Sequence, residues 1–283
     1  GKALVGVLFS PGFGREVKAG RDAQVQILLD GSDSNTANIA LGYAQAMVSL
    51  YNIEVRGAAR ERLGAPKVEG VDSRIRVIFN SDLKSRNYIV PGLIAVILMI
   101  IAAVLTSLCI AREWENGTME QLLSTPLRPV ELLLGKLTAY FTIGMVDMVI
   151  SILTGLFLFQ VPLHGSLLLL IATSCIFCFG ALCWGIMLSA AARNQLIAYQ
   201  LSMLSSFLPA FLLSGFIYSI ENMPIVIQAI SYLVPARYFV TILKGIFLKG
   251  VGIEILWVEI LAMTFYGAIV FALAVRRMRQ KVA

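Results

Sequence analysis

Charged residues are scarce in this sequence. They make up 14% of its 283 residues, whereas 58% are hydrophobic, and the mean hydropathy is +0.81. An ordinary soluble domain carries about 25% charged residues, so the composition excludes a soluble fold and indicates an integral membrane protein. The net charge of +6 comes from basic residues that flank apolar runs rather than from one patch, which argues against nucleic-acid binding.

Histidine and cysteine are also rare. His164 is the single histidine, and all four cysteines lie inside apolar runs. Cys175 and Cys178 form a CxxC, but the second Cys or His pair that a zinc site needs is missing. We therefore expect no metal site and interpret the cysteines, like the small residues spaced along the spans, as packing residues.

Nucleotide-binding and hydrolase motifs are missing as well. Gly135 and Lys136 resemble the end of a Walker A motif, but Leu137 follows where that motif needs Ser or Thr. GxSxG and HExxH do not occur. We therefore predict that the chain is not an enzyme and that any ATP it uses binds to a partner.

Residues 1–87 differ in kind from the rest. They hold twelve of the 23 basic and nine of the 17 acidic residues. Residues 2–9, 23–29 and 75–79 read as strands, residues 13–20 as a short helix, and the cap-rich residues 32–35 open a helix of about fifteen residues that ends near Tyr51. The pattern predicts a small α/β domain.

Residues 88–283 are dominated by apolar runs. Five runs reach the roughly twenty residues that a helix needs to cross a bilayer, at 88–111, 130–160, 166–191, 196–219 and 254–275. Pro224 and Pro235 break the apolar stretch 220–250 into pieces that are too short to span. We expect re-entrant or interfacial helices in that outer stretch.

Basic residues set the predicted orientation. Most of those that flank the spans fall on one side: Arg112, Arg128, Lys136, Arg193, Arg276, Arg277, Arg279 and Lys281. Because Lys and Arg accumulate in cytoplasmic loops, we expect this side and the C-terminus to be cytoplasmic and residues 1–87 to lie outside. Residues 1–20 do not resemble a signal peptide, so we expect an upstream segment with one more transmembrane helix.

The polar loop 112–129 between the first two runs has a helix pattern of its own. Thr118 and Gln121 fit a capping box. In a helix, one face would carry the apolar side chains of Met119, Leu122 and Leu123. The other face would carry the polar side chains of Glu120, Gln121 and Ser124. We predict a short amphipathic helix on the inner membrane surface, ended by Pro126 and anchored by Trp114. The pattern alone leaves a plain connector and a protein-docking element open.

The run AREWENGTMEQLLSTPLRPVELLLGK closely resembles the first cytoplasmic loop of permeases in the type-2 ABC exporter superfamily. SRNYIVPGLIAVIL, LLDGSDSNTANIALGY and SYLVPARYF resemble the same family, so the likeness covers nearly the whole chain. It implies an α-helical integral membrane protein with an outer α/β domain and six transmembrane helices, five of them visible here.

This resemblance also implies a function. The chain would be the permease subunit of an ATP-driven exporter in a bacterial inner membrane, with ATP and Mg on a separate cytosolic ATPase subunit. Two permease halves, identical or paralogous, would form the translocation path, and a periplasmic adaptor protein is a further implied partner. Loop 112–129 would couple the ATPase to the spans. The implied coupling residues are Arg112, Glu113, Trp114, Glu115, Gly117, Thr118, Met119, Glu120, Gln121, Leu122 and Leu123.

Asp147 is the one acid that we place deep in a span. It would line the cargo path or a dimer contact, or serve as a neutral structural group, and the sequence leaves these open. Aromatic residues of the spans are candidates for an apolar cargo surface, although packing is the commoner role: Tyr140, Phe141, Phe207 and Phe211.

Two other classes of function stay open. An ion-coupled secondary transporter would need several buried ionisable groups and matched repeats, which we do not find. A membrane receptor or scaffold, with an outer ligand-binding domain and a signalling loop, would use the same polar loop. Capture of an ATPase would separate an exporter from both.

Overall fold

The computed structural model describes residues 5–19, 23–31, 34–63, 71–78, 84–192 and 194–282. The chain divides into two compact units, Gly1–Tyr88 and Ile89–Ala283. Parts of the predicted elements lie outside the described residues, namely residues 2–4, Gly20, the cap residues Ser32 and Asp33, Phe79 and the basic Arg193.

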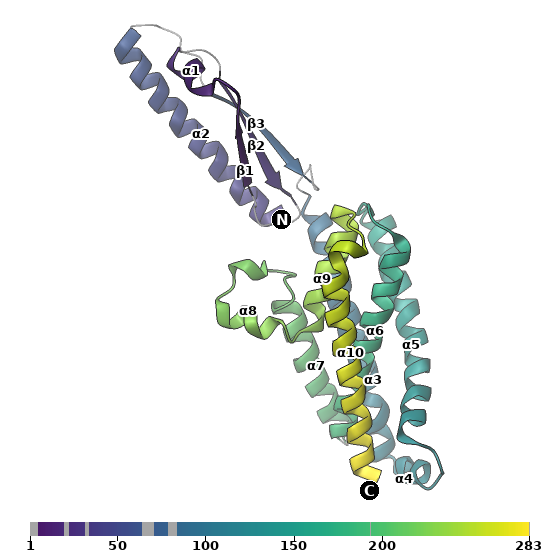
Figure 1. Cartoon of the computed structure of the whole chain (residues 1–283). Helices are drawn as coiled ribbons and strands as arrows, with labels where there is room; N and C mark the ends of the chain where they lie inside the picture. Colours follow the sequence, from purple (N-terminus) through teal and green to yellow (C-terminus); the bar gives the residue numbers. More distant parts are fainter. Residues whose placement is uncertain are drawn as a thin grey trace. The chain divides into compact units, whose positions relative to one another are not determined.

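The N-terminal unit is a three-stranded sheet with two helices (Figure 1). Its elements are β1 (Val5–Phe9), α1 (Phe13–Lys18), β2 (Ala23–Asp30), α2 (Ser34–Leu63) and β3 (Val71–Ile78). β1 is antiparallel to the central β2, and β3 is parallel to β2, so the chain has to cross over between β2 and β3 and does so through α2. In β2, buried apolar side chains alternate with exposed or half-buried ones, and the buried face forms the core of this unit.

Helix α2 is twice as long as the sequence predicted. It continues past Tyr51 to Leu63, thirty residues in all, because no proline interrupts it and Asn52 does not end it. The Asn52 side chain instead exchanges two hydrogen bonds with the backbone of Val71, at 2.6 and 3.1 Å, and so holds α2 to the start of β3.

The second unit is a helical bundle in which the five predicted spans are confirmed as helices. These are α3 (Ser85–Glu115), α5 (Pro129–Leu153) continued by η1 (Thr154–Leu158), α6 (Leu167–Ala192), α7 (Gln195–Leu212) and α10 (Ile253–Val282). Within the described ranges, these five are long and apolar enough to cross a membrane, and a sixth span is reached if one bent helix pair is counted. The chain is therefore a multi-pass membrane protein.

The fourth span is shorter than predicted. α7 ends at Leu212 rather than near residue 219, because Pro209 weakens its last turn and Gly215, at φ +78°, turns the chain away. After η2 (Ile220–Asn222), the helix α8 (Ile225–Ser231) meets α9 (Pro235–Lys244) and η3 (Gly245–Lys249) at an angle of 89°. The predicted break of this stretch at its prolines is confirmed, and the geometry is that of a broken span or a re-entrant loop.

Small residues let the helices of the bundle approach closely. A Cβ on Gly180 of α6 would stand 3.5 Å from the Cα of Gly267 in α10, and one on Gly144 of α5 would stand 2.6 Å from the sulfur of Cys178. α6 also stacks Phe177 on Phe239 of α9, with ring centroids 4.1 Å apart. Gly180 and Cys178 thus have the packing role that the sequence predicted for them.

One end of the bundle gathers the connections of interest, and we call it the loop end. It comprises the end of α3, the short helix α4 (Thr118–Leu123), the starts of α5 and α7, and the last turns of α10. Figure 1 shows α4, the start of α5 and the C-terminus of α10 at this same end.

Candidate functional site

Helix α4 begins differently from the prediction. Gly117, at φ +70°, occupies the N-cap position, and no side chain caps the helix, so the predicted capping box of Thr118 and Gln121 is wrong. The Thr118 hydroxyl donates instead to the Glu113 carbonyl oxygen at 3.3 Å. The reason is that the left-handed glycine moves Thr118 inside the first turn, where its side chain reaches back to α3.

The two faces of α4 are confirmed. Met119 is 1% exposed and Leu122 is half-buried against the core of the bundle, whereas Glu120 and Gln121 are exposed. The side chain of Leu123 lies outside the described residues. Met119 therefore holds α4 to the bundle, and the surface that a partner could reach is the polar face.

The acidic residue Glu113 is used inside the protein. It forms an ion pair with Lys136 of α5, and the two side chains are only 22% and 17% exposed. The second carboxylate oxygen of Glu113 is buried, with no hydrogen-bond partner among the described residues. This pair ties the end of α3 to the second turn of α5.

Glu115 and Arg112 tie the same end of α3 to α7. The carboxylate of Glu115 accepts hydrogen bonds from the backbone N–H of Gln195, at 2.9 Å, and from its side-chain amide. Arg112 Nε donates to Gln195 Oε1 at 3.4 Å. A carboxylate at a helix start satisfies a free N–H and interacts well with the helix dipole. Gln195 was not among the residues predicted from the sequence, although the N-cap residue Asn194 before it marks a helix start.

α6 holds the same region from a third side. The hydroxyl of Ser189 accepts hydrogen bonds from the backbone N–H groups of Ile110 and Ala111, at 3.0 and 2.8 Å. Trp114, predicted as an anchor at the membrane interface, is half-buried and packs against the core of the bundle. The end of α3 is thus fastened to α5, α6 and α7.

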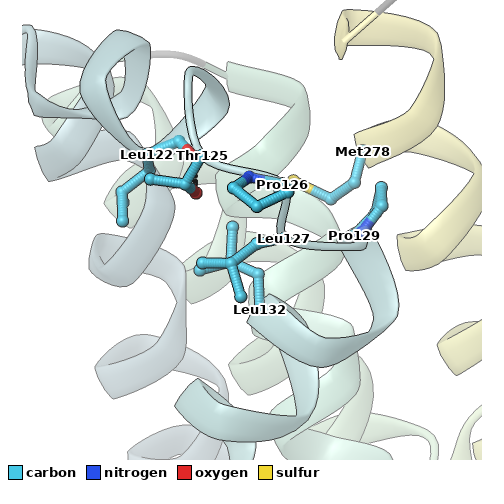
Figure 2. A pocket seen from close by; sticks show the side chains of 7 residues that line it. All are labelled: Leu122, Thr125, Pro126, Leu127, Pro129, Leu132 and Met278. Atoms are coloured by element: carbon cyan, nitrogen blue, oxygen red, sulfur yellow. Dashed lines mark hydrogen bonds between the residues drawn. The ribbon is translucent and has the colours of Figure 1, made fainter.

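A small pocket lies between α4, the start of α5 and the end of α10. Its volume is about 230 Å³, and its lining is Leu122, Thr125, Pro126, Leu127, Pro129, Leu132 and Met278. Figure 2 shows the Met278 side chain reaching from α10 toward Pro126, with Leu127 and Leu132 beside it. No charged side chain lines this pocket.

The chain matches, over residues 1–276, a family model described as ABC-2 family transporter protein. It belongs to this family. It is 42% identical over 236 residues to the probable multidrug ABC transporter permease YbhS of Escherichia coli, an alignment that covers 82% of this chain and 61% of YbhS. It is 32% identical to the probable multidrug ABC transporter permease YbhR of the same species, over 99% of this chain and 74% of YbhR.

A third relative, the inner membrane transport permease YhhJ of Escherichia coli, is 29% identical over the whole of this chain and 74% of its own length. The chain thus spans only 61% of the length of YbhS. The type-2 ABC permease predicted from the sequence is confirmed. These three relatives are all named as permeases.

The candidate cargo residues of this ABC-2 permease are not brought to one surface. Tyr140 of α5 lies beside Cys109, which belongs to the last turns of α3. Phe211 packs between Phe207 and Phe216, at 5.2 and 5.8 Å between ring centroids, and Phe216 covers Gly92 near the start of α3. The two groups are separated by roughly 25 Å along α3 at the helical rise per residue.

The permease has a second half-buried acid that the sequence analysis overlooked. Asp147 on α5 has one carboxylate oxygen buried with no hydrogen-bond partner within the described part of the chain, and Glu259 on α10 is in the same situation. Asp147 is still the acid predicted deep in a span, because Glu259 lies on the second turn of α10, near the start of that helix.

Proposed function

We propose that this chain is the permease subunit of an ATP-driven exporter and that its loop end docks a cytosolic ATPase subunit. The proposal rests on a difference within loop 112–129 between an exposed part and a part that is bonded to the spans. α4 leaves its polar face free at the surface, while the residues just before it are fastened to three spans. A force applied to α4 therefore reaches α5, α6 and α7 without passing through a flexible linker.

Each fastening would carry part of that force. A movement of the end of α3 would pull α5 through the ion pair of Glu113 with Lys136. It would pull α6 through Ser189 and the start of α7 through the bonds of Glu115 with Gln195. Coupling of this kind needs packed elements with two arrangements, and buried polar links keep such elements in register. Glu113 and Glu115 thus transmit the contact, whereas the exposed Glu120 is free to make it.

The remaining parts of the proposal follow from the family and the charge pattern. ATP and Mg would be bound by the ATPase subunit, and two permease halves would enclose the path. Arg112, Arg128, Arg276 and Arg277 at the loop end support a cytoplasmic location for that end, with residues 1–87 outside, in a bacterial inner membrane. Cargo of the multidrug kind is supported by the names of YbhS and YbhR, and a periplasmic adaptor by family analogy.

The docking surface can be tested with a charge reversal. Glu120→Arg should weaken binding of the ATPase subunit to the full-length permease in nanodiscs about tenfold, because it places a like or unpaired charge in a contact formed with an acid. Glu120 is chosen because Glu113 and Met119 are buried, and replacing them would disturb the fold. Titration of the purified ATPase against immobilised permease measures the effect.

The matched control is Glu221→Arg, the same change at an exposed acid of η2, far along the chain from the loop end. It should leave the affinity unchanged. Equal affinities for all three proteins would remove α4 from the docking surface, and failure of the wild type to bind any ATPase would remove the exporter function itself.

The buried acids allow a test against ion-coupled transport. If ATP drives export, proteoliposomes with the permease, its ATPase and ATP should keep transporting after a protonophore collapses the proton gradient. The variant Asp147→Asn with Glu259→Gln should show the same insensitivity, because neither carboxylate has an ionic partner among the described residues to relay a proton. Transport that stops with the protonophore would favour the ion-coupled class.

A further inference from the structure

The pocket at the loop end has the size and chemistry of a socket for a single side chain. Its volume of about 230 Å³ is below the roughly 300–1,000 Å³ typical of small-molecule sites. Leucine, methionine and proline form most of its lining. A drug-sized cargo molecule would not fit, and a charged headgroup would meet no charged side chain in the lining, whereas one bulky apolar side chain would fit against the leucine, methionine and proline residues.

The position of the pocket indicates where that side chain comes from. Leu122 lines the pocket from the inner face of α4, whose outer face carries the exposed Glu120 and Gln121. Pro126 and the half-exposed Leu127 continue from α4 along the pocket. Because Thr125, Pro126 and Leu127 are exposed directly after α4, the pocket lies where a protein docked on α4 can reach it. An apolar anchor in a pocket, surrounded by a polar rim, is the usual arrangement of a binding hot spot.

We propose that one aromatic or long aliphatic side chain of the ATPase subunit inserts into this pocket. The inference rests on the proposed function, since it takes the ATPase as the protein that covers α4. The socket also adds a mechanical link, because Met278 belongs to α10. α10 packs against α6 through Gly267 and Gly180, so a side chain inserted beside Met278 would place the ATPase in contact with a span that packs on α6.

The test fills the pocket by enlarging one of its lining side chains. Leu132→Trp enlarges a lining side chain and should weaken binding of the purified ATPase subunit to the full-length permease at least tenfold, since burial of a large apolar side chain is lost. Leu134→Trp is the matched control, because Leu134 is 45% exposed on the same helix and does not line the pocket. It should bind within about twofold of wild type, and equal melting temperatures of the two variants exclude a folding defect.

A second measurement identifies the occupant. A photoreactive benzoylphenylalanine in place of Leu127 should cross-link to an apolar residue of the bound ATPase, located by mass spectrometry. A cross-link to lipid or to another segment of the permease would overturn the proposal. So would unchanged affinity of Leu132→Trp in an experiment where Glu120→Arg weakens binding, a result that leaves the docking function standing. If wild type binds no ATPase, both fall together.

Discussion

Replacing Gly185 with alanine should prevent the membrane unit from packing correctly. A Cβ at this position of α6 would stand 2.1 Å from the hydroxyl oxygen of Thr106 and 2.2 Å from the carbonyl oxygen of Ala103. Thr106 could rotate away, but the carbonyl is backbone of α3, so the two helices would have to separate. Overpacking of this kind costs about 1–3 kcal/mol, and more where backbone has to move.

The loss would extend beyond the contact itself. Ser189 lies one turn further along α6 and accepts its two hydrogen bonds from α3 at 3.0 and 2.8 Å. Separation of the helices would lengthen both bonds and leave polar groups without partners in an apolar environment. Gly185→Ala should therefore lower the melting temperature and also weaken the coupling of ATP hydrolysis to transport.

Gly135→Ala provides the control. Gly135 is a helical glycine of α5, and a Cβ there would meet nothing within 4 Å. Alanine at a free helix position stabilises by about 0.5–1 kcal/mol relative to glycine. The melting temperature of the detergent-solubilised protein should thus rise or stay level for Gly135→Ala and fall for Gly185→Ala. Equal melting temperatures would show that α3 and α6 are not as closely packed as the structure has them.

The bundle could be predicted from sequence because its signal is local. A run of about twenty apolar residues specifies a spanning helix whatever surrounds it, so all five helices were found. Their ends depend on weaker signals. α7 stops at Leu212 because Pro209 and Gly215 act together on its last turn, although the apolar run itself continues for several residues.

The loop end was predicted only in part, for the same reason. The two faces of α4 follow from helical periodicity within six residues, and they were found. The partners of the charged side chains could not be predicted, because Glu113 and Lys136 are 23 positions apart in the sequence and Glu115 and Gln195 are 80 positions apart. Which side chains meet across helices depends on rotation and tilt, and these are set by packing.

The structure adds a second role for these charges. The resemblance implied that Arg112, Glu113 and Glu115 couple the chain to the ATPase, and the structure shows each of them bonded to another helix of the same chain. Lys136 was interpreted only as a marker of orientation. A basic residue near a span end can serve both purposes, because the side that carries positive charge is also where an acid of the neighbouring loop is available to pair with it.

Lys136→Met should be strongly destabilising and should uncouple the exporter. The change leaves the Glu113 carboxylate in a site that is about four-fifths buried, with one oxygen already lacking a partner among the described residues. Removal of one member of a buried ion pair costs about 3–5 kcal/mol, and about 2–4 kcal/mol at this degree of exposure. Glu113→Gln in the same chain removes the stranded charge, so the double variant should recover much of the loss.

The coupling readout separates a mechanical role from a purely structural one. With the ATPase bound, the double variant should be nearly as stable as wild type but should hydrolyse ATP with reduced transport, because α5 has lost its ionic link to α3. Arg276→Met, which removes an exposed positive charge at the same end, should change neither stability nor coupling. Wild-type transport by the stabilised double variant would show that Glu113 and Lys136 only hold the helices together. The force from α4 would then reach the spans through Ser189 and Gln195.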